Sequence, residues 1–363
     1  MEREASKDAS CKMRGKGNGG TNMKPVVVTA LALLLLLFLW PMVFLGGPTP
    51  APEESESLPT ATLPIDRASV RPAEEWAGKS DGETVVRVKQ ADGTVTALSM
   101  ADYLWRVVAA EMPASFEPEA LKAQAATART YTLYKMLNGP VTGHTDADVC
   151  TDITCCQAYI DPAQAAANWG DAAPLYTQKI ADAVAATDGQ AILYGGRPID
   201  AVFFSSAAGS TLDAVEVWGG SVPYLTGVAS PEGEEVPGYR SQVTVPLEAF
   251  KTAFLAQYPQ ADLSGEAAGW FQNTVPTSNG GVETVDVGGV TVKGTALRTL
   301  FDLRSTHFTA SAGPEGITFH VTGYGHGVGL SQYGANALAK QGRTWQEIVA
   351  WYYTGVTVGT YAT

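Results

Sequence analysis

An apolar run near the N-terminus constrains this chain more than any other feature. The run from Val26 to Leu45 reads VVVTALALLLLLFLWPMVFL and carries no charge, and about 20 apolar residues suffice for a helix to cross the hydrocarbon layer. The segment from Lys12 to Lys24 before it is basic, and basic residues stay on the cytoplasmic side. The sequence therefore predicts a cytoplasmic tail over 1–24, a membrane anchor over 25–46 and an exported remainder. A cleaved signal peptide is the alternative, but its apolar core would be shorter.

Composition sets the broad class of the exported part. Residues 47–82 are rich in Pro, Ser, Thr, Ala and Glu and show no apolar periodicity, which predicts a flexible, extended tether. The chain is 45% hydrophobic, so residues 83–363 can bury a core. The formal net charge is -13. We expect no nucleic-acid partner, because affinity for nucleic acid depends mainly on Lys and Arg.

A hairpin and a helix open the exported unit. Asp92-Gly93 is a turn signal between two short strand-like runs, Val85–Val88 and Thr94–Ala97. Ser99 predicts the N-cap of the helix that follows, and Pro113 predicts its end. One face of this helix carries Leu104, Val107, Val108 and Glu111.

Glu111 is the candidate catalytic residue. Its sequence neighbours are apolar, and an apolar setting favours the protonated form of a carboxyl group, which glycosidases use as a proton donor. The alternative is a glutamate that exits to solvent at a frayed helix end. A second helix runs from Pro118 to Gly139-Pro140, with Gln124 and Arg129 beside its small-residue face. In the functional interpretation these two residues support Glu111 or contact sugar; the alternative is a satisfied polar pair at a helix contact.

Three blocks, in order along the chain, carry a family resemblance. They read AAEMPASFEPEALKAQAATARTYTLYK from Ala109 to Lys135, IDAVFFSSAAGSTLDAVEVWGGSVPYL from Ile199 to Leu225, and GYGHGVGLSQYGANALAKQG from Gly323 to Gly342. Together they resemble the stage II sporulation protein D family, which includes the amidase enhancers. The resemblance implies a lytic transglycosylase that acts on peptidoglycan glycan strands, with Glu111 of the EMP block as its catalytic residue.

A single carboxyl group suits such an enzyme, whereas hydrolytic glycosidases normally use two. In the mechanism that the resemblance implies, this group first protonates the oxygen between N-acetylmuramic acid and N-acetylglucosamine. It then accepts the proton of the sugar's own C6 hydroxyl, which closes a 1,6-anhydro ring. The resemblance also implies action on septal peptidoglycan during engulfment. An amidase or endopeptidase that strips the stem peptides and a membrane protein are the implied partners.

The third block combines alternating glycines with polar residues. Glycines at every second position over 323–329 predict a strand whose bare face lets a ligand or another backbone approach closely. Ser331 can cap the helix that follows, and Gln332 lies in its first turn. We expect His326, Ser331 and Gln332 to bind sugar hydroxyl or acetamido groups. The alternative is a tightly packed strand with a hydrogen-bonded histidine.

The second block gives two weaker candidates. The turn from Ser205 to Thr211 lacks the Gly-Gly pair that family members usually show before the threonine. This departure removes support for substrate contacts from Ala207, Ala208 and Ser210. From this block only Ser205 and Ser206 are carried over as substrate-binding residues.

A histidine and three cysteines form a spaced cluster, H-x5-C-x4-C-C. Its members are His144, Cys150, Cys155 and Cys156. Four soft ligands suit one closed tetrahedral zinc site, which would be structural because no coordination position stays open. The alternative in an exported protein is a disulfide, although three cysteines leave one unpaired. In similar family clusters a His stands in place of Cys155, and Asp152 is a competing ligand. The chemistry itself requires no cofactor.

These patterns predict an α+β fold, mainly antiparallel strands with packed helices, preceded by one transmembrane helix. We expect two lobes, the second over 228–312 with a hairpin in VETVDVGGVTVKG, and a substrate cleft between them. Thr344 and Glu347 predict a capping box for the last helix.

Two other functions remain open, a non-catalytic amidase-enhancing module and a zinc amidase or peptidase, although the chain has no HExxH-like motif. The predicted location is the cell membrane, single-pass, with the N-terminus in the cytoplasm.

Overall fold

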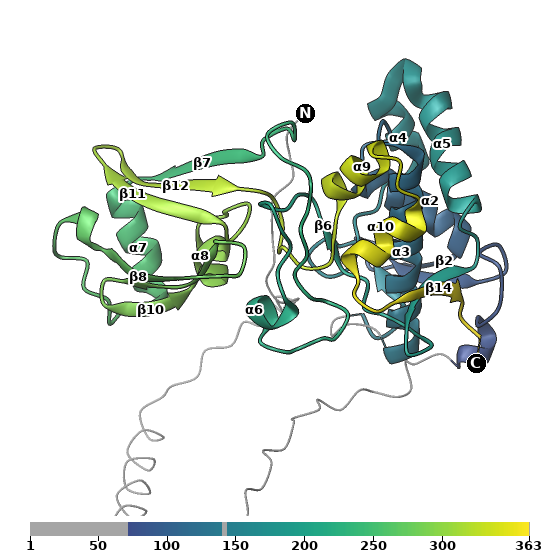
Figure 1. The fold of residues 1–363 in the computed structure, drawn as a ribbon, viewed down its shortest axis with the longest axis horizontal. Helices are drawn as coiled ribbons and strands as arrows, with labels where there is room; N and C mark the ends of the chain where they lie inside the picture. The colour runs from purple at the N-terminus through teal and green to yellow at the C-terminus, as the bar shows by residue number, and fades with distance from the viewer. Residues whose placement is uncertain (1–71, 140–143, 363) are drawn as a thin grey trace, which may run out of the picture. The chain divides into compact units, whose positions relative to one another are not determined.

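The computed structural model describes residues 72–139 and 144–362 (Figure 1). The predicted tail, the anchor over 25–46 and the tether up to residue 71 lie outside the described residues. Within the described part, no helix combines the length and apolar character needed to cross a membrane. Residues 72–82, which composition assigns to the tether, are folded: Trp76 is 2% exposed and stacks on Tyr361 with 5.4 Å between ring centroids. The tether was assigned from the average composition of residues 47–82, and one buried tryptophan changes that average little.

The predicted hairpin and the first two helices are confirmed. Strand β1 (Val85–Lys89) pairs antiparallel with β2 (Val95–Ser99). Helix α2 (Met100–Glu111) begins after Ser99, whose hydroxyl accepts a hydrogen bond from the backbone N–H of Asp102 at 3.1 Å. Helix α3 (Pro118–Asn138) begins with a proline, which lacks the N–H that a first helical residue leaves unpaired anyway.

A first hydrophobic core surrounds α3. The small residues of α3 between Ala120 and Ala128 are buried, so α2, α5, α9 and α10 can pack closely against it (Figure 1). Strand β4 pairs antiparallel with both β5 and β14, and β3 lies parallel to β1. The predicted capping box at Thr344 and Glu347 is confirmed. The elements of this part are η3 (Ala73–Glu75), β3 (Val149–Cys150), α4 (Pro162–Trp169), η4 (Gly170–Ala172), α5 (Ala173–Ala185), β4 (Gln190–Tyr194), β5 (Arg197–Pro198), α9 (Gln332–Lys340), α10 (Trp345–Tyr352) and β14 (Thr357–Thr360).

A second core lies within the segment from Arg240 to Thr322. Phe250 is fully buried there and stacks on Phe301 with 4.8 Å between centroids. Two antiparallel sheets, in the orders β11-β12-β7 and β10-β9-β8, pack with helices α7 and α8 (Figure 1). The hairpin predicted in VETVDVGGVTVKG is confirmed as β9–β10. The elements are β7 (Arg240–Val245), α7 (Leu247–Gln257), η5 (Ala267–Gly269), β8 (Phe271–Pro276), β9 (Val282–Val287), β10 (Val290–Lys293), α8 (Gly294–Leu300), β11 (Phe308–Gly313) and β12 (Gly316–Thr322).

The α+β class with mainly antiparallel strands is therefore confirmed, and the described residues form two hydrophobic cores. The bounds of the second lobe differ from the predicted 228–312. They shift because β7 and β12, one at each end of the segment, pair with each other across it. Pairing between strands so far apart in sequence cannot be placed from local patterns.

The glycine-rich segment after β12 is a loop, and the predicted strand is wrong. The four alternate glycines over 323–329 have φ between +77° and +120°, a region that residues with a side chain rarely adopt. A Cβ at Gly323 would lie 2.8 Å from the carbonyl oxygen of Ser206. The predicted close approach is thus confirmed, with the backbone around Ser206 as the neighbour. The two segments are also joined by the parallel strands β6 (Phe203–Phe204) and β13 (Leu330–Ser331).

Candidate functional site

Glu111 is the last residue of α2, and core packing fixes this end of the helix. Leu104, Val107 and Val108 are fully buried, as an amphipathic stripe requires. Met112 then leaves the helix in an extended conformation, with ψ 143°, while its N–H still bonds to the carbonyl of Val108. The rigid helix therefore ends at the residue that carries the carboxyl group.

Two distant segments hydrogen-bond the Glu111 carboxylate. The backbone N–H of Ala158 donates to Oε1 at 2.6 Å, and the side-chain amide of Gln332 donates to Oε2 at 3.2 Å. Hydrogen bonds to a carboxylate are stronger than those between neutral groups, so these contacts hold the side chain in one orientation. The setting is more polar than the apolar sequence neighbours of Glu111 predict.

Glu111 lines a cavity of about 600 Å³, a size typical of ligand sites, which span about 300–1,000 Å³. Glu111 is the only acidic side chain among the described residues of its wall. The aromatic side chains of the wall include Trp169, Phe203, Trp218, Tyr324 and Tyr333. One carboxyl group among aromatic surfaces and hydrogen-bonding groups suits a large, polar and mostly uncharged ligand.

Six of the predicted site residues line this cavity. They are Glu111, Cys155, Cys156, Ser205, His326 and Gln332. The ring of His326 is held by backbone groups: the N–H of Val328 donates to Nδ1 at 3.2 Å, and Nε2 lies 2.9 Å from the carbonyl oxygen of Phe203. Nε2 must then carry the proton, because a carbonyl can only accept. Both ring nitrogens of His326 are therefore hydrogen-bonded to the backbone, as the alternative to sugar binding predicts. Its side chain nevertheless lines the cavity.

The four remaining residues that were predicted to bind substrate do not line this cavity. Arg129 is 1% exposed and forms a buried ion pair with Asp81. It therefore belongs to a buried polar pair, as the alternative interpretation predicts, but its partner is Asp81 and not Gln124. Gln124 is fully buried and has no hydrogen-bond partner within the described chain. Ser206 pairs through its backbone with the glycine loop. Ser331 is fully buried and caps α9, its hydroxyl accepting from the N–H of Gly334 at 3.3 Å.

A buried carboxylate that sequence reasoning missed, Glu232, supports this cap. Its side chain is 4% exposed. Oε1 accepts hydrogen bonds from the N–H of Ala207, at 2.7 Å, and from the hydroxyl of Ser331. Oε2 accepts from the hydroxyl of Ser230 at 2.5 Å. Glu232 thus ties the turn of the second block to the start of α9, where a negative charge is favourable.

This network bears on the site because Gln332 follows Ser331 directly. A fixed N-cap fixes the first residue of α9, and with it the amide that reaches Glu111. No local pattern separates Glu232 from its neighbours Glu234 and Glu235, which are both exposed. The contact from Ala158 could not be predicted for another reason: its donor is a backbone N–H, which nearly every residue type carries.

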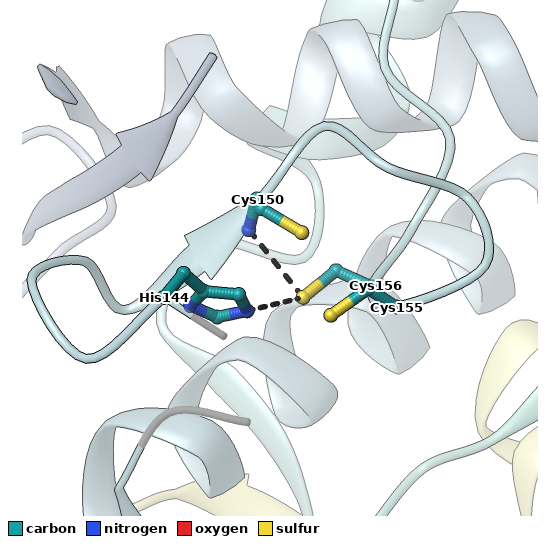
Figure 2. A group of neighbouring side chains, drawn as sticks. All are labelled: His144, Cys150, Cys155 and Cys156. Atoms are coloured by element: carbon teal, nitrogen blue, oxygen red, sulfur yellow. Dashed lines mark hydrogen bonds between the residues drawn. The ribbon is translucent and has the colours of Figure 1, made fainter. Parts of the chain in front are cut away.

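His144, Cys150, Cys155 and Cys156 converge as predicted (Figure 2). Their ligand atoms lie within 4.8 Å of one another, and Nε2 of His144 is 3.4 Å from Sγ of Cys156. Ligands of a tetrahedral zinc lie about 3.5–3.8 Å apart, from the usual Zn–S and Zn–N bond lengths. The cluster therefore fits one zinc ion after a contraction of about 1 Å. The three cysteines are free thiols, so the described chain contains no disulfide between them.

Electrostatics in the cluster also favour a cation. Burial lowers the pKa of His144, but hydrogen bonds and charge from Cys150 and Cys156 outweigh it and raise the pKa to about 10. Hydrogen bonds from Cys155 and then Cys156 lower the pKa of Cys150 far below that of a free thiol. Nδ1 of His144 is buried without a hydrogen-bond partner in the described residues. The lowered pKa of Cys150 therefore gives the cluster a thiolate, whose charge either a proton on His144 or a metal ion can balance.

Comparison with known proteins gives the family of this chain. The family model described as stage II sporulation protein matches residues 89–194. Stage II sporulation protein D of Bacillus subtilis is 34% identical over 80% of this chain and 83% of its own length. The protein of the same name from Bacillus amyloliquefaciens is 35% identical, over 74% and 77%. The amidase enhancer of Bacillus subtilis is 29% identical over 70% of this chain and 40% of its own. The chain therefore belongs to the stage II sporulation protein D family.

Proposed function

We propose that this chain is a peptidoglycan lytic transglycosylase with Glu111 as its catalytic acid. The observation that carries the proposal is the single acidic side chain among the described residues of the cavity wall. Hydrolytic glycosidases use two carboxyl groups, about 5–9.5 Å apart, and the described wall offers no second one. A lytic transglycosylase needs one, because the sugar's own C6 hydroxyl replaces the water or the protein nucleophile.

The two hydrogen bonds to Glu111 fit the first half of this reaction, in which its carboxyl group becomes charged. Glu111 gives its proton to the glycosidic oxygen, which leaves as the C4 hydroxyl of N-acetylglucosamine while its bond to C1 of N-acetylmuramic acid breaks. The resulting carboxylate is stabilised by the N–H of Ala158 and the amide of Gln332. It then accepts the C6 hydroxyl proton as that oxygen bonds to C1 and closes the 1,6-anhydro ring. Proton donor and base are thus the same side chain.

The four-residue cluster has a structural role in this proposal. His144, Cys150, Cys155 and Cys156 would hold one zinc ion, which supplies charge neutralisation and a cross-link within the loop. The cluster ends at Cys156, two positions before Ala158, whose N–H holds Glu111. A fixed loop keeps that donor in place, and no chemical step requires the metal.

Family membership and the N-terminal sequence support the cellular role that we propose. We place the chain in the cell membrane as a single-pass protein, anchored by residues 25–46, with the folded part outside. It would cleave septal peptidoglycan during engulfment, with a membrane partner and with an amidase or endopeptidase that removes stem peptides. The glycan would lie in a cleft between the two lobes, because the cavity of Glu111 also includes Arg298 of the second lobe.

A non-catalytic role is the second candidate, since one relative is named amidase enhancer. Such a module would bind glycan strands and leave them intact. It would have no need for a carboxyl group held by two donors inside a cavity, as Glu111 is. We therefore favour the enzyme.

Replacing Glu111 with glutamine tests the proposal. Glutamine keeps the size of the side chain but cannot donate and accept the proton. We expect glycan cleavage to fall at least about 1,000-fold, because the same group serves both halves of the reaction, with an unchanged melting temperature. A folded Glu111→Gln variant that cleaves like the wild type would refute the role of Glu111. No cleavage by the wild type would favour the binding module.

A further inference from the structure

Trp218 is the most exposed tryptophan of the described chain, at 51%. It ends the short helix α6 (Ala214–Trp218) in the second sequence block. Its side chain lines the cavity of Glu111. A large indole ring that is exposed to solvent inside a cavity is an apolar surface that binding of a ligand can cover.

A second cavity of about 760 Å³ adjoins the first. The two cavities share four lining residues, Thr154, Trp218, Arg298 and His326. The second cavity continues from Trp218 along the second lobe, past Tyr258 and Lys293. The two hollows therefore form one groove, and Trp218 stands where they meet.

Trp218 is held in place rather than loosely attached. Its ring lies 5.4 Å from that of His326, and both nitrogens of His326 are fixed by backbone groups. Glu216, in the same helix, completes a capping box with Asp213 and accepts hydrogen bonds from the N–H and the hydroxyl of Ser278, at 2.6 and 2.7 Å. A binding surface that is rigid before the ligand arrives loses little entropy on binding.

We infer that Trp218 is the stacking platform of an additional sugar subsite, which binds a glycan residue away from the bond that is cleaved. This inference rests on the proposed function. An enzyme that cuts inside a polymer must bind sugars on both sides of the bond, and the second cavity extends the cavity beside Glu111. A pyranose ring has an apolar C–H face that fits an aromatic face. Binding energy gained at such a remote position can be used at the reacting bond.

The choice of a sugar over a protein or membrane partner follows from the groove. Trp218 lies between two cavities, and Glu111 lines the first of them, so a ligand that covers the indole ring is continuous with the ligand held at the catalytic candidate. Val215, on the same short helix, is also exposed, at 48%, but lines neither cavity. It offers a matched control for any disturbance of α6.

The test measures binding without cleavage, in the full chain carrying Glu111→Gln. Peptide-free glycan strands of two and of four disaccharide units are titrated by calorimetry against this parent and against added Trp218→Ala, Trp218→Phe or Val215→Ala. We expect Trp218→Ala to bind the longer strand about tenfold or more weakly, as for other aromatic anchors. Trp218→Phe should lose less, and Val215→Ala should match the parent. The shorter strand should be affected less than the longer one.

Several outcomes overturn the inference. Equal affinity of the parent and Trp218→Ala for the longer strand would remove the subsite, and so would an equal loss for both strands. If Trp218→Ala has a lowered melting temperature, Trp218→Phe decides instead. A folded Trp218→Phe variant that loses as much affinity as Trp218→Ala, or the same factor for both strands, contradicts the stacking platform, because phenylalanine keeps an aromatic face. A parent that binds no strand refutes the proposed function itself, whereas a binding parent with an unaffected Trp218→Ala refutes the subsite alone.

Discussion

Replacing Gln332 with alanine removes a side-chain amide that donates to the Glu111 carboxylate at 3.2 Å. Hydrogen bonds to charged groups contribute about 1.5–3 kcal/mol, and 3.2 Å is at the long end of the normal range. The lower figure applies, and about 1.4 kcal/mol corresponds to a tenfold change in rate. The contact matters most when Glu111 becomes charged, so the loss should appear in kcat rather than in KM. We expect kcat for glycan cleavage to fall about tenfold with KM nearly unchanged.

The assay is release of soluble fragments from peptide-free glycan strands, with kcat and KM measured separately. Gln341→Ala is the matched control, because Gln341 follows the other end of the same helix, is exposed and does not line the cavity of Glu111. Both variants should melt at the wild-type temperature. A folded Gln332→Ala protein with kcat within about twofold of wild type would refute the reasoning.

Three further predictions concern stability. Glu232→Ala leaves the N–H of Ala207 and two hydroxyl groups without their buried acceptor, so the free energy of unfolding should fall by roughly 3–5 kcal/mol in urea titrations; a change below about 1 kcal/mol would contradict the network. His326→Ala should lower both glycan cleavage and the melting temperature, because backbone groups bond both ring nitrogens; lost cleavage at an unchanged melting temperature would instead indicate direct sugar binding. Chelation, or Cys150→Ser, should remove one zinc per chain and lower the melting temperature, with elemental analysis and a free-thiol count as the measurements; no zinc and one free thiol would mean a disulfide.

Features encoded by short stretches of sequence were predictable. The N-cap at Ser99, the proline at the start of α3 and the capping box at Thr344 depend on residues within four positions of each other. The strand predicted from the alternating glycines over 323–329 was wrong, because a period of two is also produced by a loop that has positive φ at every second residue. Only the neighbouring backbone at Ser206 selects the loop.

The candidate site was predictable in part. Glu111 and Gln332 are 221 positions apart, so no periodicity relates them. Both were predicted as site residues only because each lies in one of the blocks that carry the family resemblance. Arg129 was misplaced for a traceable reason: its partner Asp81 lies in the stretch that composition assigned to the tether. The roles of Ala158 and Glu232 depend on a backbone donor and on burial, which side-chain identity does not encode.

The chemical end of the product tests the central claim most directly. Defined peptide-free glycan strands are incubated with the wild-type protein and with Glu111→Gln, and the fragments are identified by mass spectrometry. With a single carboxyl group in the described cavity wall, we expect 1,6-anhydro-N-acetylmuramic acid ends from the wild type and intact strands from the variant. Reducing ends, which are one water heavier, would show hydrolysis and contradict the account.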